Sequence, residues 1–176
     1  GFVAGPNGEM DFLHVDEEIF DYVGDRVDSI DTPVYGRKTW EMMEGYWPTA
    51  GDAPNASKHD IHHSQWYKEV HKVVLSKSLK GQDLRNVTVI GDDIKAQFEK
   101  LKQGPGNDMV IFGSPSAAHA LMEHNLIDGY WLFVNPILIG NGIPFFKNVQ
   151  QRTALRLVSA HSFSSGVISL DYNRAE

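Results

Sequence analysis

Two cations and a hydroxyl follow a glycine at the end of a strand-like run, and this order suits a bound phosphate. The run covers residues 32–35, and Gly36, Arg37, Lys38 and Thr39 come directly after it. Glycine lets the backbone approach a ligand closely. The free N–H groups and the positive dipole end of a following helix attract an anion. An ordinary solvated turn with two surface cations would have the same sequence, because short motifs of this kind are common.

Two further strand-like runs end in residues of similar chemistry. After the run 109–112 come Gly113, Ser114, Pro115 and Ser116, and after the run 72–76 comes Lys77, with Ser76 as its last residue. Hydroxyls at a helix start can cap it, and Pro suits the first helical position. Three such strand ends indicate a phosphorylated ligand, although Ser, Gly and Lys are also frequent in plain turns. Neither G-x-G-x-x-G nor G-x-x-x-x-G-K-[ST] occurs, so a standard dinucleotide fingerprint and a P-loop are both excluded.

The elements that must position these residues alternate between strand and helix. Hydrophobic spacing and turn residues predict strands over 32–35, 72–76, 87–90 and 109–112, with helices over 16–30, 37–43, 58–70, 92–103 and 117–124. Residues 45–57 are rich in Gly, Pro and Ala and predict a loop. Strands over 130–139, 155–163 and 167–172 follow, the last two joined as a hairpin. This order predicts an α/β fold with a mostly parallel, helix-flanked sheet and an antiparallel C-terminal hairpin. Parallel order brings the strand ends to one edge, where ligands bind.

Composition narrows the class of protein. The chain has 176 residues, of which 41% are hydrophobic and 22% charged, and this predicts a single domain over 1–176. There is no Cys, which excludes disulfides and thiolate chemistry. The net charge of -7 argues against nucleic acid as a partner. With no membrane-length apolar run and no basic-then-apolar leader, we expect no membrane association and a cytoplasmic location.

Four motifs in order carry a resemblance to a known family. They are residues 1–8 (GFVAGPNG), 36–41 (GRKTWE), 110–114 (VIFGS) and 135–146 (NPILIGNGIPFF). The chain resembles the dihydrofolate reductase-like superfamily. It is most similar to the branch that shares its domain with the reductase of bacterial riboflavin biosynthesis, the C-terminal reductase domain. Family members have a further strand before the position of Gly1, so we expect one to be missing here.

The resemblance implies a three-layer fold, NADPH as the cofactor and a homodimer. By the family pattern, the cofactor-binding residues would be Ala4 and Gly5 beside the nicotinamide, Gly36, Arg37, Lys38 and Thr39 at the adenosine-side phosphates, Ser76 and Lys77 near the 2′-phosphate, and Gly113, Ser114, Pro115 and Ser116 at the pyrophosphate. The implied activity is hydride transfer to a C=N or C=O of a small heterocyclic substrate. The two precedents are dihydrofolate reductase and 5-amino-6-(5-phosphoribosylamino)uracil reductase. The alternative is an NADPH-binding protein without turnover, acting as a regulator or a dimeric scaffold.

Hydride transfer of this kind also needs a proton donor and side chains that hold the substrate in position. Asp11 and Asp16 are the candidate catalytic carboxyls, with Glu17 beside them, since a buried carboxyl can relay a proton. Capping and dipole matching at a helix start would use the same residues. Phe12 and Trp40 are candidate substrate-binding residues, and packing in the core is their alternative.

Three histidines stand at helical spacing that could bind a metal. They are His59, His62 and His63. The sequence offers no clear further ligand for them, so we expect a solvated helix face and no metal site.

Overall fold

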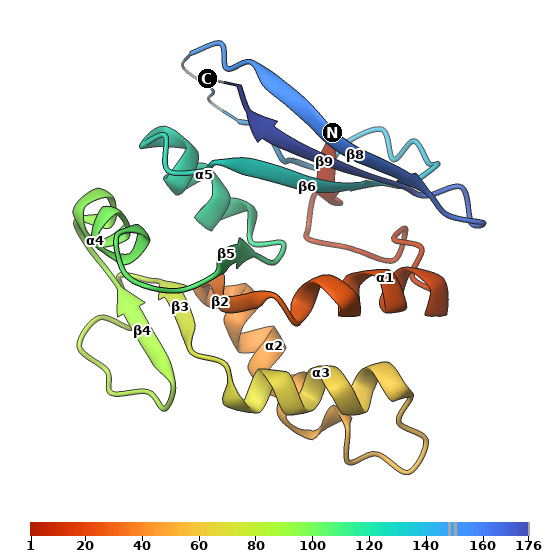
Figure 1. Cartoon of the computed structure of the whole chain (residues 1–176), viewed down its shortest axis with the longest axis horizontal. Helices are drawn as coiled ribbons and strands as arrows, with labels where there is room; N and C mark the ends of the chain where they lie inside the picture. The colour runs from red at the N-terminus through yellow and green to blue at the C-terminus, as the bar shows by residue number, and fades with distance from the viewer. Residues whose placement is uncertain (148, 150, 176) are drawn as a thin grey trace. The chain divides into compact units, whose positions relative to one another are not determined.

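The computed structural model describes residues 1–147, 149 and 151–175, and within it the chain divides into two compact units. The first unit combines residues 1–19 with 118–176, and the second unit contains residues 20–117. Figure 1 shows the elements of both, coloured along the chain. The predicted single domain over 1–176 stays a prediction. No helix of the described residues has the length and apolar character needed to cross a membrane.

A four-stranded parallel sheet forms the centre of the second unit. Its order is β4-β3-β2-β5, with bounds Val87–Ile90, Lys72–Leu75, Ile30–Gly36 and Asp108–Ile111. β2 and β3 are the inner strands, and their apolar residues Val34, Tyr35, Val73 and Val74 are at most 1% exposed. Parallel strands that are covered on both faces have continuous apolar runs, which explains why apolar and polar residues do not alternate at Val34–Tyr35 and Val73–Val74.

Five helices begin within or next to this unit. They are α1 (Glu17–Val27), α2 (Arg37–Ala50), α3 (Lys58–Glu69), α4 (Ile94–Lys102) and α5 (Pro115–Glu123). Ser57 and Asp60 start α3 through a capping box, in which the Ser57 hydroxyl accepts the Asp60 N–H and the Asp60 carboxylate accepts the Ser57 N–H. α2 packs against α3, as Figure 1 shows.

The predicted loop over 45–57 is wrong in its first half, because α2 continues to Ala50 with Pro48 inside it. Trp47 explains the extension. Its ring lies 4.0 Å from that of His63 on α3 and 4.9 Å from that of Tyr46. Packing between the two helices therefore outweighs the weak helix preference of Gly45 and Pro48.

The first unit contains two antiparallel sheets. A short one pairs β1 (Phe2–Ala4) with β7 (Ile143–Pro144). The other has the order β6-β9-β8, with bounds Gly129–Val134, Ile168–Arg174 and Leu155–Ser162. β8 and β9 form the predicted C-terminal hairpin, and the strand predicted over 130–139 ends at Val134, two residues before Pro136. The predicted fold class, a parallel helix-flanked sheet with an antiparallel C-terminal hairpin, is confirmed.

Candidate site at the carboxyl edge of the parallel sheet

The two glycine-containing strand ends meet directly in the second unit. The Gly36 N–H donates a hydrogen bond of 2.9 Å to Ser114 Oγ, across 78 residues of sequence. A Cβ placed on Gly36 would lie 3.1 Å from Ser116 Oγ, closer than ordinary packing allows. Because glycine has no side chain, the starts of α2 and α5 can approach one another closely around the Gly36 backbone.

The second strand end has an unusual backbone. Gly113 has φ = 58° and Ser114 has φ = 45°, so two successive residues adopt a left-handed conformation. Such a conformation costs a non-glycine residue roughly 1–2 kcal/mol. Ser114 is 2% exposed, and its bond to the Gly36 N–H offsets part of that cost. The turn presents the exposed Ser116 hydroxyl at the start of α5.

The first turn of α2 has no side-chain cap. Gly36 occupies the N-cap position with an extended backbone, and it has no side chain that could cap the helix. Uncapped N–H groups at a helix start form an anion-binding site. Arg37 and Lys38 are exposed beside it, and Arg37 forms a 3.0 Å ion pair with Glu41 one turn along the helix. An exposed pair of this kind is weak, so the guanidinium can exchange partners.

The third predicted strand end lies at the same edge. Leu75 pairs with Gly36 in the register of β3 and β2, which places Ser76 and Lys77 one step beyond that edge. Ser76 Oγ accepts the Leu79 N–H at 3.2 Å, so this hydroxyl already shapes the turn. Lys77 is exposed. The sheet therefore brings together all the predicted phosphate-side residues, and their role in binding stays a prediction.

Gly91 follows β4 at this same edge and was not among the residues predicted for the site. Leu75 pairs with Ile90, so Gly91 stands next to Ser76. A Cβ on Gly91 would lie 2.8 Å from the Lys80 Cβ and 3.1 Å from the Ser76 carbonyl oxygen. The signal was a glycine directly after a strand, the same pattern that singled out Gly36 and Gly113.

The nicotinamide-side candidates lie in the first unit. Ala4 is 7% exposed and pairs with Ile143, and the Gly5 N–H donates to the Glu9 carbonyl oxygen at 2.8 Å. Gly142 lies against the Ala4 carbonyl, so a side chain at this position would collide with β1. Both binding assignments stay predictions.

The candidate carboxyls differ in their surroundings. Asp16 caps α1: its Oδ1 accepts the Ile19 N–H at 2.9 Å, and its Oδ2 lies 2.9 Å from His14 Nε2. The Ile19 N–H lowers the pKa of Asp16, so the carboxylate is ionised at neutral pH. This favours the capping role over proton donation. Asp11 is exposed in a turn and its catalytic role stays a prediction, as does that of Asp16.

The two candidate substrate-wall residues are both half-buried. Phe12 lies in the loop of the first unit, and Trp40 lies in the first turn of α2. Trp40 Nε1 is buried and has no hydrogen-bond partner among the described residues. A buried indole N–H normally has a partner, so the Trp40 N–H is an exception that favours a role for this side chain beyond packing.

The histidines on α3 do not form a solvated face, and that prediction is wrong for His63. Its ring is 7% exposed and lies 4.0 Å from Trp47 and 5.0 Å from Trp66, while His59 stacks on Phe20 at 4.1 Å. Burial lowers the pKa of His63 to about 4, so it is neutral at pH 7. Within the part of the chain that the structure describes, no three His, Asp or Glu side chains converge on a possible metal.

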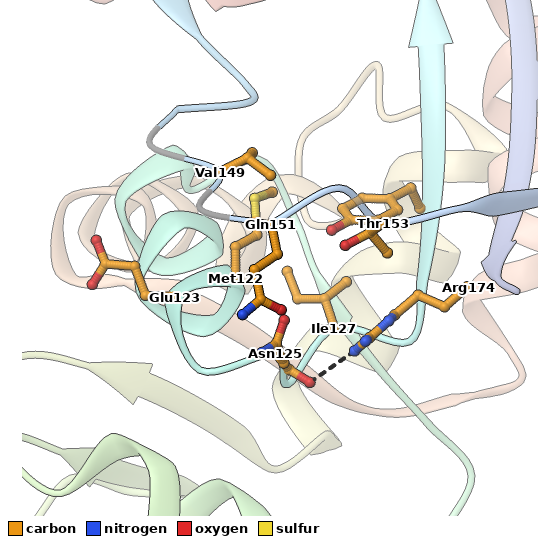
Figure 2. A pocket seen from close by; sticks show the side chains of 9 residues that line it. Met122, Glu123, Asn125, Ile127, Val149, Gln151, Thr153 and Arg174 are labelled. Carbon is orange, nitrogen blue, oxygen red and sulfur yellow. Dashed lines mark hydrogen bonds between the residues drawn. The ribbon is translucent and has the colours of Figure 1, made fainter. Parts of the chain in front are cut away.

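A separate pocket of about 120 Å³ lies in the first unit, around the C-terminal end of α5 (Figure 2). Arg174 extends along its rim and donates a 3.0 Å hydrogen bond to the Asn125 carbonyl oxygen. Met122, Ile127 and Tyr130 also line it. It contains none of the residues predicted to bind a cofactor or a substrate.

Comparison with known proteins identifies the family. Residues 1–169 match the family described as the RibD C-terminal domain, and the chain belongs to it. The uncharacterized protein YyaP of Bacillus subtilis (strain 168) is 33% identical over 176 residues, covering 98% of this chain and 88% of YyaP. The predicted resemblance to the reductase branch of the dihydrofolate reductase-like superfamily is confirmed.

Two crystal structures share the fold at low sequence identity. A Shewanella sp. PV-4 protein named for riboflavin biosynthesis has a TM-score of 0.71 at 19% identity, covering 100% of this chain and 93% of its own. The Thermotoga maritima diaminohydroxyphosphoribosylaminopyrimidine deaminase/5-amino-6-(5-phosphoribosylamino)uracil reductase has a TM-score of 0.64 at 12% identity. The match covers 99% of this chain and 53% of that one.

Proposed function

We propose that this protein is an NADPH-dependent reductase that transfers a hydride to a C=N or C=O of a small heterocyclic substrate. The observation that carries the proposal is the contact of Gly36 with Ser114, which joins two helix starts at one edge of a parallel sheet. The site has the donor chemistry of a pyrophosphate cradle: free backbone N–H groups, hydroxyls and cations. Membership of the RibD C-terminal domain family supports the reductase type of function.

The residues at this edge fit a dinucleotide phosphate. Because Gly36 has no Cβ, Ser116 lies close to its backbone, and the starts of α2 and α5 are near enough to hold phosphate oxygens together. Arg37 and Lys38 would neutralise the adenosine-side phosphates, and Thr39 would add a hydroxyl. Gly113, Ser114, Pro115 and Ser116 would hold the pyrophosphate from the start of α5. Ser76 and Lys77 would contact the 2′-phosphate, which distinguishes NADPH from NADH.

When bound, NADPH supplies the hydride, and the protein supplies orientation and electrostatics. Ala4 and Gly5 would border the nicotinamide. Phe12 would orient the heterocycle, and the free Trp40 N–H would donate a hydrogen bond to a ligand oxygen. Asp11 is the candidate proton relay, since Asp16 is held ionised by its capping bond. The two substrate precedents are a pterin C=N and the ribosylamino group of a pyrimidine.

The competing proposal is an NADPH-binding protein without turnover. The capping role of Asp16 favours it, because that bond removes one of the two candidate proton donors.

Cofactor choice provides the first test. We expect NADPH to quench tryptophan fluorescence at micromolar concentrations and NADH to bind more weakly. Lys77→Ala should weaken NADPH binding roughly tenfold, since a charge-assisted contact contributes about 1.5 kcal/mol, and leave NADH binding unchanged. Lys58→Ala is the matched control, because Lys58 is an equally exposed lysine at the start of α3.

A second measurement separates the two proposals. Oxidation of NADPH is followed by absorbance with dihydrofolate and with the phosphoribosylaminopyrimidine. Turnover of either supports a reductase, whereas binding without turnover of both supports the binding protein. No fluorescence response to NADPH would rule out both functions.

A further inference from the structure

The dipeptide Asn-Gly occurs twice in the chain, at Asn7–Gly8 and at Asn141–Gly142. Asparagine followed by glycine is especially prone to spontaneous deamidation, because glycine has no side chain to hinder attack by its backbone nitrogen on the preceding amide. Both asparagines are exposed in the first unit, so water reaches either of them. The two sites share their local sequence and their exposure, and the fold distinguishes them by their contacts.

The hydrogen bonds around Asn7 oppose the reaction. Asn7 Nδ2, the nitrogen that would leave as ammonia, donates to Glu9 Oε1 at 2.7 Å, and the Asn7 backbone N–H donates to Glu9 Oε2 at 2.9 Å. The Gly8 N–H, which belongs to the attacking nitrogen, donates to the Gly5 carbonyl oxygen at 3.0 Å. Both reacting groups are therefore engaged with other residues, and these bonds would have to break before the ring could close.

At Asn141 the reacting groups contact each other. The Gly142 N–H donates a 2.9 Å hydrogen bond to Oδ1 of the Asn141 side chain. This bond holds the attacking nitrogen beside the side-chain amide and polarises the carbonyl group of that amide. The Asn141 backbone N–H donates to the Ile139 carbonyl oxygen at 2.8 Å, which fixes a tight turn directly before the pair. The same dipeptide is thus arranged for the reaction here and restrained at Asn7.

We propose that Asn141 is a modification site, at which the folded chain deamidates in preference to Asn7. The Gly142 nitrogen attacks Cγ of Asn141 and forms a new N–C bond, while the bond from Cγ to Nδ2 breaks. The proton of the Gly142 N–H leaves with the ammonia, and a cyclic succinimide remains. Water then opens the ring at either carbonyl group and gives aspartate or isoaspartate. Water is the co-reactant, so the reaction proceeds whether or not the protein binds NADPH.

The product would weaken the short sheet of the first unit. Gly142 directly precedes β7, and a Cβ placed on it would lie 3.1 Å from Phe2 Cβ, so its backbone packs tightly on β1. The next residue, Ile143, pairs with Ala4. Isoaspartate lengthens the backbone by one methylene group between Asn141 and Gly142 and adds a negative charge. Both changes act on the segment that leads into this pairing.

Mass spectrometry of peptides from the incubated protein measures both sites in one sample. Mildly alkaline pH favours the reaction, because it helps to remove the proton from the attacking nitrogen. In the folded chain we expect Asn141 to deamidate roughly tenfold faster than Asn7, since the bonds at Asn7 add to its activation barrier. In concentrated urea the folded contacts are lost, and the two rates should become similar.

Two variants test the cause and the consequence. Glu9→Ala removes both side-chain acceptors from Asn7, so the rate at Asn7 should rise several-fold while the rate at Asn141 keeps its wild-type value. Asn141→Ser prevents the modification and is the control for its effect. During incubation the thermal unfolding temperature of the wild type should fall as isoaspartate accumulates, and that of Asn141→Ser should change much less.

Equal rates at the two sites of the folded chain would overturn the proposal, as would a faster reaction at Asn7. A folded chain that stays intact at Asn141, while the urea-unfolded chain reacts there, would show that the Gly142 hydrogen bond protects the amide. That result would also overturn it. A rate at Asn7 that Glu9→Ala leaves unchanged would contradict the reason given for the difference.

Discussion

The four-stranded parallel sheet and the three-stranded antiparallel sheet differ in how far their apolar residues are exposed. In the parallel sheet, Val73 and Val74 of β3 are at most 1% exposed, and helices supply the cover. In the antiparallel sheet, every residue of β8 is exposed. The inner strands of the parallel sheet therefore form a core within the second unit, and Ser76, Ser114 and Ser116 place hydroxyl groups at its carboxyl edge. The outer strand of the antiparallel sheet is exposed along its whole length within the first unit taken by itself.

Two isoleucines give the largest expected contrast. Ile90 in β4 is 1% exposed, and Ile168 in β9 is 38% exposed. Ile90→Ala should lower the free energy of unfolding by about 3–4 kcal/mol, because it removes buried methyl groups and leaves a cavity. Ile168→Ala should cost less than about 1 kcal/mol, because the Ile168 side chain is already partly in contact with water. Urea unfolding measures both changes in the free energy of unfolding. Equal losses would show that the two isoleucines contribute equally to stability despite their different exposure.

The buried histidine gives the second contrast, through pH. The ordinary pKa of His is 6.5, and burial, with smaller contributions from the charges of His59 and His62, lowers that of His63 to about 4. Between pH 6.5 and 4 the unfolded chain binds the extra proton, so stability is full above pH 6.5 and falls as the pH approaches 4. Integrated over this window, the loss is about 3 kcal/mol.

His63→Phe should flatten this pH dependence while keeping a ring between Trp47 and Trp66. Urea unfolding of both proteins at a series of pH values measures the difference. If the wild type and His63→Phe lose stability in parallel on acidification, His63 is not the group responsible.

The smallest contrast lies within the candidate site itself. Ser114→Ala leaves the buried Gly36 N–H without its acceptor and should cost about 1–2 kcal/mol. Ser116→Ala removes an exposed hydroxyl and should change stability by less than about 0.5 kcal/mol. Thermal unfolding distinguishes the two. A reversed order would mean that the hydroxyl of Ser116, and not that of Ser114, joins the two strand ends.

Most elements of the fold could be predicted from residue spacing. The strand at Val87–Ile90 and the starts of α2 and α3 agree with the sequence-based bounds, because glycine or a capping serine marks each boundary. The continuation of α2 through Pro48 could not be predicted, since it depends on Trp47 meeting His63 from another helix. The same contact explains why α3 does not have a solvated histidine face.

The residues of the candidate site could be predicted from the sequence, but the contacts between them could not. Glycines after strands pointed to the correct edge of the sheet, and parallel order brought them together. The hydrogen bond between Gly36 and Ser114 joins residues far apart in sequence. It depends on a left-handed backbone conformation at Ser114, for which serine has no strong preference. Asp16 was predicted from its residue type, and its structural contact differs from the predicted role. Its carboxylate accepts the Ile19 N–H in the first turn of α1.

The glycine at the N-cap of α2 has one more consequence. Gly36 contributes no side-chain oxygen, so the first turn of this helix lacks the acceptor that Ser57 gives to α3. A phosphate oxygen bound there would serve as the missing cap. The ligand would then be part of the secondary structure, and occupancy of the site and order in the first turn of α2 would rise and fall together.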